Sequence, residues 1–274
     1  MSRRTEDGRI IMKVIAFHSY KGGTGKTNLS TNTAAILAKE GHKTVLLDFD
    51  FRGPNLVTLF NTMFDTRPEK TINDFLFRDM PAEEIIYDLE PDLGIPLSVC
   101  FASTDFHDIQ RIIRADKQQR QRNLKRILRL KDNLAEKFDY AFIDTSPGIQ
   151  MESIDALVIS DTVLLVLKPD DFDLHGTETM VSQLYALLDS RNYAVLNRVV
   201  GEQCSPNCVV SDIEREGYEK VIKNRLKLDL VGAISCYCDL ARSGSKNIFT
   251  LIYPDHGFTS GIKNLIEVIH ATGA

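Results

Sequence analysis

A glycine-dense turn between an expected strand and an expected helix constrains the fold most strongly. Residues 12–19 (MKVIAFHS) form a short β-rich run, and the turn that follows reads SYKGGTGKTN over 19–28. Apolar side chains then recur at helical spacing as far as Gly41, and a second apolar run occupies 43–50. This order of strand, turn, helix and strand predicts the opening βαβ unit of a parallel sheet.

The same alternation continues toward the C-terminus. Helical periodicity is present at 172–190, at 211–225 and after Thr259. The further expected strands are 96–102, 139–145, 161–169, 193–199 and 228–235. Strands that are apolar on both faces are typical of a sheet covered by helices on both sides. We therefore expect an α/β fold with a single doubly wound, mostly parallel sheet. A flexible leader is expected at 1–11 and one domain at 12–274, because no linker rich in Pro, Gly or Ser divides the chain.

Composition excludes several classes of protein. With 43% hydrophobic and 26% charged residues, the 274-residue chain is not a disordered polymer, and its net charge of −5 gives no global basicity. No apolar run reaches the roughly 18 residues of a membrane span, and the N-terminus has no secretory signal. Five cysteines, an odd number, make a disulfide framework unexpected and favour a cytoplasmic location.

The glycine-dense turn has the chemistry of a phosphate-binding loop. Glycines let successive backbone N–H groups point at one anion, and the following helix, expected to begin near Lys26, places its positive end there. Lys26 would reach the β and γ phosphates, and the Thr27 hydroxyl would bind Mg²⁺. The residues expected to bind the nucleotide in this loop are Gly22, Gly23, Thr24, Gly25, Lys26, Thr27 and Asn28.

Carboxylates follow two of the expected strands. Asp48 and Asp50 end the run at 43–50 and would lie on one side of the chain if it stayed extended, while Asp144 ends the strand at 139–145. A strand-end aspartate is often only a helix cap. Three of them near a phosphate loop instead predict a magnesium site, because strand ends in a parallel sheet converge at one edge. We expect Thr27, Asp48 and Asp144 to contribute to that site.

The segment KGGTGKT, with Lys21 in addition to Lys26, resembles the deviant Walker A motif of the MinD/ParA family of ATPases. DFDFRGPN at 48–55 is more similar to the MinD-like branch than to the ParA branch. The resemblance covers about residues 12–270. It implies a P-loop fold, binding of ATP and magnesium, and a dimer in which Lys21 crosses to the partner's phosphates.

The resemblance also implies roles for individual residues. Asp50 would orient or deprotonate the attacking water, Asp144 would hold Mg²⁺ through water, and Asn197 would bond adenine. A cap or turn remains the alternative for Asn197. In the segment IDTSPG, Thr145 and Ser146 stand where the family usually has one residue before proline, so the geometry of this loop is expected to differ.

Two functional classes follow from this resemblance. The first is an ATP-dependent switch, homodimeric with ATP, that controls positioning or the binding of an activating or cargo protein. Residues 111–131 contain nine Lys/Arg and one acid, so they form either a solvated helix face or a contact with anionic membrane or DNA.

The second class is a metallocofactor-handling or reductase-type ATPase. Its motivation is two close pairs of cysteines, which could supply four thiolates to zinc or to an iron–sulfur cluster at a dimer interface. The four residues are Cys204, Cys208, Cys236 and Cys238. Four ordinary reduced thiols are the alternative, since neither spacing is the common C-x2-C.

Overall fold

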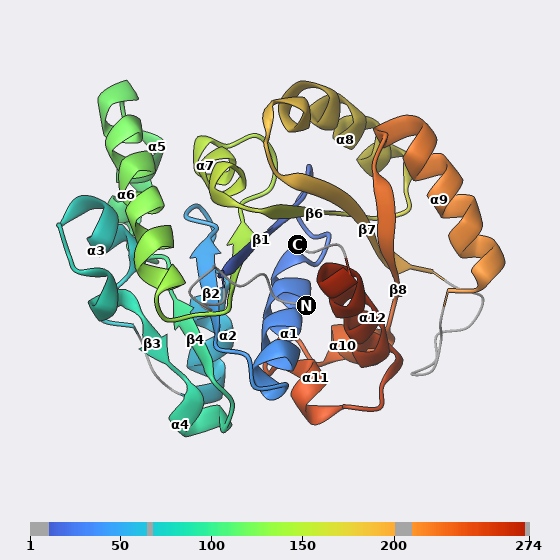
Figure 1. The fold of residues 1–274 in the computed structure, drawn as a ribbon, viewed down its shortest axis with the longest axis horizontal. Helices are drawn as coiled ribbons and strands as arrows, with labels where there is room; N and C mark the ends of the chain where they lie inside the picture. Colours follow the sequence, from blue (N-terminus) through green and yellow to red (C-terminus); the bar gives the residue numbers. More distant parts are fainter. Residues whose placement is uncertain (1–10, 65–67, 201–209, 272–274) are drawn as a thin grey trace.

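A computed structural model describes residues 11–64, 68–200 and 210–271. Its strands form one eight-stranded sheet in the order β3-β4-β2-β5-β1-β6-β7-β8, in which only the β3–β4 pair is antiparallel (Figure 1). The strands are β1 (Lys13–His18), β2 (Thr44–Phe49), β3 (Tyr87–Asp88), β4 (Leu97–Cys100), β5 (Tyr140–Thr145), β6 (Thr162–Leu167), β7 (Arg191–Val199) and β8 (Asp229–Ser235). The expected α/β class and mostly parallel sheet are confirmed.

Helices connect most of these strands. The longer ones are α1 (Lys26–Lys39), α2 (Leu56–Phe64), α5 (Phe106–Ile113), α6 (Lys117–Ala135), α7 (Met151–Ile159), α8 (Asp171–Leu184), α9 (Asp212–Leu226) and α12 (Gly257–Ala271). The shorter ones are α3 (Ile72–Phe77), α4 (Glu90–Leu93), α10 (Cys238–Arg242), α11 (Phe249–Ile252) and the 3-10 turns η1 (Ala82–Ile85) and η2 (Tyr185–Leu187).

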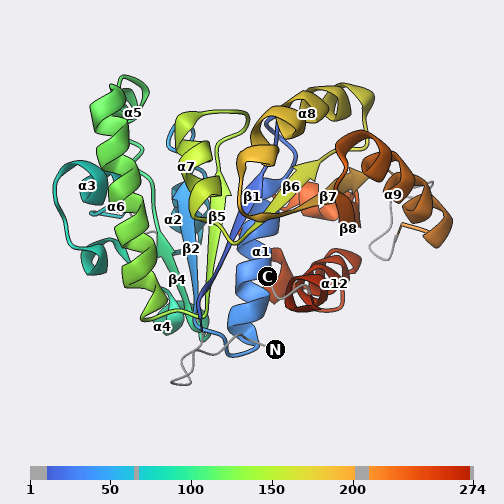
Figure 2. The ribbon, with the colours of Figure 1, turned by 45° about the horizontal axis from the view of Figure 1, so that its top comes forward.

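The helices cover both faces of the sheet (Figures 1 and 2). Along β1, Val14 and Ala16 belong to one apolar core, whereas Ile15 and Phe17 belong to the other. Helices α3, α6, α7, α8 and α9 pack into the first core, and α1, α2, α11 and α12 pack into the second. Because successive strand residues point to opposite faces, a strand buried on both sides must be apolar throughout.

The expected elements differ from the observed ones in a few places. The expected strands lie within two residues of the observed ones, but the two-residue edge strand β3 was not expected. Helix α12 begins at Gly257 rather than after Thr259, and its apolar stripe is buried against β8 and α1. The expected leader lies outside the described residues apart from Ile11. No helix in the described ranges combines the length and hydropathy needed to cross a membrane.

Candidate nucleotide-binding site

The phosphate loop joins β1 to α1 at the carboxyl edge of the sheet. Gly23 and Gly25 have φ of +74° and +97°, which side chains rarely tolerate, so glycine is required at both positions. Helix α1 begins at Lys26, as predicted. No described side chain caps its N-terminus, and no acid lies in its first turn. The first N–H groups of α1 are therefore available to an anion.

Asn197 holds the loop from the neighbouring half of the sheet. Its side chain is 6% exposed, and Nδ2 donates a 2.8 Å hydrogen bond to the carbonyl oxygen of Thr24. A Cβ on Gly25 would lie 2.3 Å from the same Nδ2, so this close approach also requires glycine. Asn197 thus supports the phosphate loop in this structure. Its expected contact with adenine stays a prediction.

Lys26 points back into the loop that precedes it. Its Nζ donates to Oγ of Ser19 at 2.8 Å, and that hydroxyl donates in turn to the carbonyl oxygen of Lys21 at 2.6 Å. Burial lowers the pKa of Lys26, while nearby carboxylates, Asp144 first, oppose the change. Ser19 was not predicted to contribute to the site. The signal available in the sequence is a hydroxyl residue at the start of the glycine-dense turn.

Thr27, Asp48 and Asp144 come together beneath the loop. Oγ1 of Thr27 donates to Oδ2 of Asp144 at 2.6 Å, and Asp48 lies opposite Asp144 on the adjacent strand. Burial raises the pKa of Asp144 to about 7. The pKa of Asp48 is raised well above its usual value, first by burial and then by the neighbouring charge of Asp144.

These three residues fit a magnesium ion. One oxygen of each carboxylate, Oδ2 of Asp48 and Oδ1 of Asp144, is buried without a hydrogen-bond partner among the described residues. Mg²⁺ prefers oxygen ligands, and a divalent cation offsets the repulsion of two buried carboxylates. Sequence reasoning therefore selected the residues that the fold brings together.

Asp50 lies on a turn rather than on an extended strand. β2 ends at Phe49, and the Asp50 carbonyl accepts a hydrogen bond from the Gly53 N–H. The strand on which Asp48 and Asp50 would share one side therefore ends before it reaches Asp50. The backbone N–H of Asp50 instead donates to Oδ1 of Asp48 at 3.0 Å. Asp50 still lies close enough to the site for its charge to oppose the lowering of the Lys26 pKa.

The beginning of the loop packs against α8. The ammonium of Lys21 lies 5.7 Å from the centre of the Phe172 ring, in the first turn of that helix. One turn later, a Cβ on Gly176 would lie 2.0 Å from Cε1 of Tyr20, so the tyrosine ring rests directly on this glycine. Lys21 and Lys26 thus have different surroundings.

A buried histidine, also missed by sequence reasoning, ends β1. Nδ1 of His18 lies 2.8 Å from Oη of Tyr185, and Nε2 lies 2.8 Å from the carbonyl oxygen of Gly148. Burial lowers the pKa of His18 to about 4, with the Gly148 carbonyl opposing the change. The ring is therefore neutral at pH 7. Since a carbonyl only accepts, Nε2 carries the proton and Nδ1 accepts from Tyr185.

The cysteines do not form a metal site within the described residues. Cys204 and Cys208 lie outside the described ranges, and elsewhere no group of three or more His, Cys, Asp and Glu is placed to hold a metal ion. Cys236 is a free thiol, whereas Cys238 is disulfide-bonded and has no thiolate to offer. This disulfide was not expected from the odd number of cysteines. The described residues give the metallocofactor alternative no support.

Comparison with known sequences establishes the class of protein. The family model described as "AAA domain" matches residues 12–196, which contain the phosphate loop and all the carboxylates above. The chromosome partitioning protein ParA of Myxococcus xanthus is 30% identical over 177 residues, which are 65% of this chain and 58% of that protein. Soj, the sporulation initiation inhibitor of Bacillus subtilis, is 29% identical over 62% of this chain and 64% of its own length.

Solved structures agree on the fold. The cell division ATPase MinD of Pyrococcus furiosus superposes with a TM-score of 0.73 and 23% identity, covering 95% of this chain and 99% of that one. MinD of Pyrococcus horikoshii, solved in complex with Mg-ADP, gives a TM-score of 0.70 at 21% identity, covering 96% and 99%. The chain belongs to the MinD/ParA family of P-loop ATPases.

Proposed function

We propose that this protein is an ATP-dependent switch of the MinD/ParA type. It would bind ATP with Mg²⁺, form a dimer with the nucleotide between the subunits, and hydrolyse the ATP slowly. One observation carries the proposal: an uncapped helix N-terminus, the Lys26 ammonium and three carboxylates meet at one edge of the sheet. Bound magnesium would supply charge neutralisation at the phosphates, held by Thr27, Asp48 and Asp144.

Substitutions in the loop and at Asp50 test the chemistry. Lys26→Ala should abolish binding of a fluorescent ATP analogue, because the one ammonium bonded within the loop is lost. Asp50→Ala should keep ATP bound but stop phosphate release, since binding does not require an oriented water. Lys39→Ala, at the exposed end of α1, is the matched control. An Asp50→Ala variant that hydrolyses ATP at the wild-type rate would contradict the role of Asp50 in orienting the attacking water.

The surroundings of Lys21 support its role across a dimer interface. Lys26 already provides an ammonium bonded to Ser19, whereas Lys21 lies over Phe172, a residue that is 83% exposed. Sedimentation of Asp50→Ala protein should show a dimer with ATP and a monomer with ADP. Adding Lys21→Ala should remove the ATP-bound dimer. A monomer under every nucleotide condition, or a dimer that ignores nucleotide, would contradict the switch.

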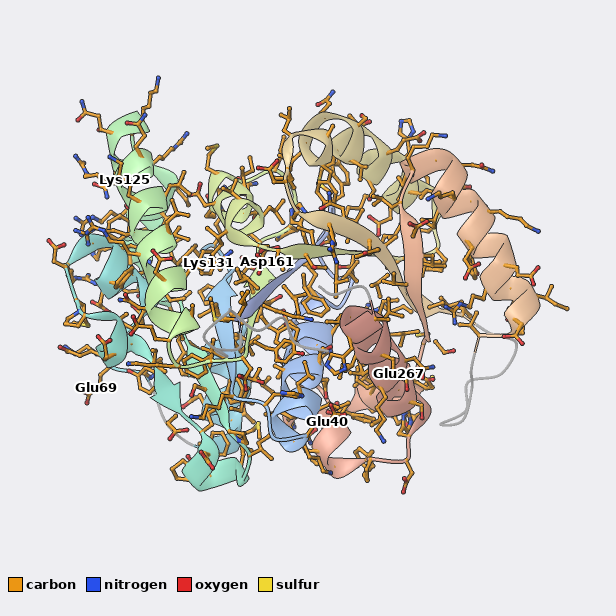
Figure 3. The ribbon with its side chains drawn as sticks, viewed as in Figure 1. Glu40, Glu69, Lys125, Lys131, Asp161 and Glu267 are labelled. Atoms are coloured by element: carbon orange, nitrogen blue, oxygen red, sulfur yellow. The ribbon has the colours of Figure 1, made fainter. Side chains whose placement is uncertain are left out.

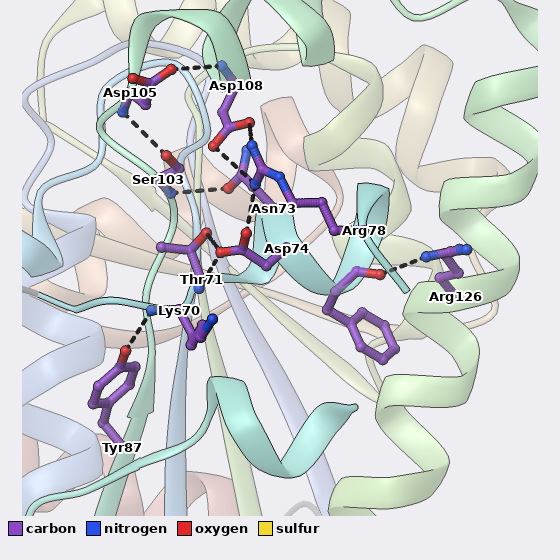
Figure 4. Close-up of polar contacts among 11 residues, drawn as sticks. Lys70, Thr71, Asn73, Asp74, Arg78, Tyr87, Ser103, Asp105, Asp108 and Arg126 are labelled. Atoms are coloured by element: carbon purple, nitrogen blue, oxygen red, sulfur yellow. Dashed lines mark hydrogen bonds and ion pairs between the residues drawn. The ribbon is translucent and has the colours of Figure 1, made fainter. Parts of the chain in front are cut away.

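Part of the basic segment at 111–131 is engaged within the protein. Arg126 bonds the Phe75 carbonyl oxygen at 2.7 Å (Figure 4). Arg126 also pairs with Asp79, and Arg111 lies over the ring of Phe77. Lys131 donates to the Ile159 carbonyl and pairs with Asp161 (Figure 3). These three side chains stabilise the packing of α5 and α6 on the rest of the protein.

The other basic residues of this segment form an exposed surface for an anionic target. They are Arg114, Lys117, Arg120, Arg122, Lys125 and Arg129. Charge reversal of the last three should weaken ATP-dependent pelleting with DNA or anionic liposomes at low salt while leaving ATP hydrolysis unchanged. Reversal of the exposed residues Lys43, Lys220 and Lys263 removes equal charge elsewhere and is the control. If the wild-type protein pellets with neither DNA nor anionic liposomes, these basic residues form only a solvated helix face.

A further inference from the structure

Two loops at the carboxyl edge of the sheet are bonded to each other through a buried hydroxyl. Ser146 follows β5, and its Oγ donates to Oδ1 of Asp50 at 2.7 Å. Oγ of Ser146 also lies 3.4 Å from the carbonyl oxygen of Phe49, which would be a longer and weaker hydrogen bond. Since a hydroxyl has one proton and a carboxylate is the stronger acceptor, the bond to Asp50 is the one that forms. Ser146 is 1% exposed, so water does not compete for this bond.

The bond selects one oxygen of the Asp50 carboxylate. Oδ1 accepts from Ser146 and also, at 3.2 Å, from the backbone N–H of Gly53, which is shared with the Asp50 carbonyl oxygen. Within the described residues, Oδ2 accepts no hydrogen bond. Two donors on Oδ1 therefore fix the rotation of the carboxylate about its Cβ–Cγ bond. This arrangement leaves Oδ2 as the oxygen able to accept a proton or bond a water.

The loops are also tied at a second point that does not involve Ser146. Nε of Arg52 pairs with Oε1 of Glu152 at 2.5 Å, and Glu152 lies in the first turn of α7. The backbone carbonyl of Ser146 accepts at 2.9 Å from Oγ of Ser153 in the same helix. The loop after β5 is thus held by contacts other than the Ser146 hydroxyl. Removing that hydroxyl should leave the loop in place and free only the Asp50 side chain.

We propose that Ser146 is a positioning residue for ATP hydrolysis, which holds the Asp50 carboxylate so that Oδ2 faces the attacking water. The proposal rests on the proposed function, because it requires Asp50 to act on that water. Ser146 itself touches neither nucleotide nor water in this scheme and transfers no proton. Its contribution is orientation, for which even small misplacements of a catalytic group reduce rates substantially.

Matched alanine variants test the proposal. Ser146→Ala removes the hydroxyl bonded to Asp50, whereas Ser153→Ala removes a buried hydroxyl that bonds only the Ser146 backbone. Each variant loses one buried hydrogen bond, so both should lower the urea midpoint of unfolding, and Ser146→Ala should lower it more because its bond is to a carboxylate. Only Ser146→Ala should lower kcat, by about tenfold or more, with KM for ATP within about twofold of wild type. Ser146→Cys keeps a weak donor of similar shape and should retain more of the kcat than alanine.

The outcomes separate this inference from the proposed function. Wild-type hydrolysis that Asp50→Ala abolishes supports the function in the same assay. If Ser146→Ala then turns over at or above the wild-type rate, the positioning role is wrong while the function stands. If Ser146→Ala and Ser153→Ala change kcat and KM alike, the hydroxyl is only structural and the proposal is again overturned. A wild type that does not hydrolyse ATP contradicts the function itself.

Discussion

Asp144 should destabilise the protein in the absence of magnesium, and Asp144→Asn should reveal by how much. Burial raises the pKa of Asp144 from 3.8 to about 7, so the folded protein holds a proton that the unfolded chain releases. The folded-state preference for the neutral carboxyl means that stability falls as pH rises between these two values. One pKa unit is about 1.4 kcal/mol, so the cost is about 2 kcal/mol at pH 5 and roughly 4 kcal/mol at pH 8.

Asparagine removes this cost because it does not ionise. Its Oδ1 can still accept from Thr27, and its amide can donate toward the buried oxygen of Asp48 that has no partner among the described residues. Urea unfolding in EDTA, followed by circular dichroism, should therefore show the variant more stable than wild type. The difference should be larger at pH 8 than at pH 5 by roughly 2.5 kcal/mol.

Magnesium nucleotide should reverse the order. A ligand that binds only the folded state stabilises it, and the substituted site has lost one anionic oxygen ligand. The control is Asp155→Asn in α7, where burial raises the pKa of the carboxyl to about 6 outside the site. Its stabilisation should persist with Mg²⁺ and ATP. A variant at Asp144 that is less stable than wild type in EDTA at pH 8, or a difference that does not depend on pH, would refute the reasoning.

Two further predictions concern the neighbourhood of the loop. Gly176→Ala should displace the Tyr20 ring and cost about 1–3 kcal/mol in thermal or urea unfolding, a penalty that a Tyr20→Ala background should remove. Gly217→Ala in α9 meets no atom within 4 Å and should stabilise by about 0.5–1 kcal/mol; equal effects at both glycines would contradict the packing argument. Because burial lowers the pKa of His18 to about 4, wild type should lose stability as pH falls from about 6.5 toward 4, by up to about 1.4 kcal/mol per pH unit. His18→Asn should lack this loss. Parallel pH profiles of the free energy of unfolding for the two proteins would contradict the role assigned to His18.

Much of the site could be predicted from sequence because its determinants are local or follow from topology. The positive φ of Gly23 and Gly25 needs only the loop itself. The meeting of Thr27 with Asp144, 117 positions apart, follows because parallel strands end at the same edge of a sheet. Neither conclusion required knowledge of side-chain packing.

The residues that sequence reasoning missed are those whose roles depend on packing between distant segments. Ser146 reaches Asp50 across 96 positions, and His18 reaches Tyr185 across 167. Serine and histidine at such places are ordinary residues until a partner is known. The basic segment shows the same limit, since its composition could not separate Arg126, which bonds a carbonyl, from its exposed neighbours. The edge strand β3, with two residues, is too short to give a periodic pattern.

The phosphate loop is therefore supported by parts of the protein far from its motif. Helix α8 contacts it through Gly176, the η2 turn reaches the end of β1 through Tyr185, and β7 bonds it through Asn197. The exposed Phe172, in the first turn of α8, lies beside Lys21, so this helix adjoins the loop at both Phe172 and Gly176. The Tyr20 ring leaves no space for even one additional methyl group at Gly176, so this part of the loop cannot move toward α8 unless the ring or the helix is displaced.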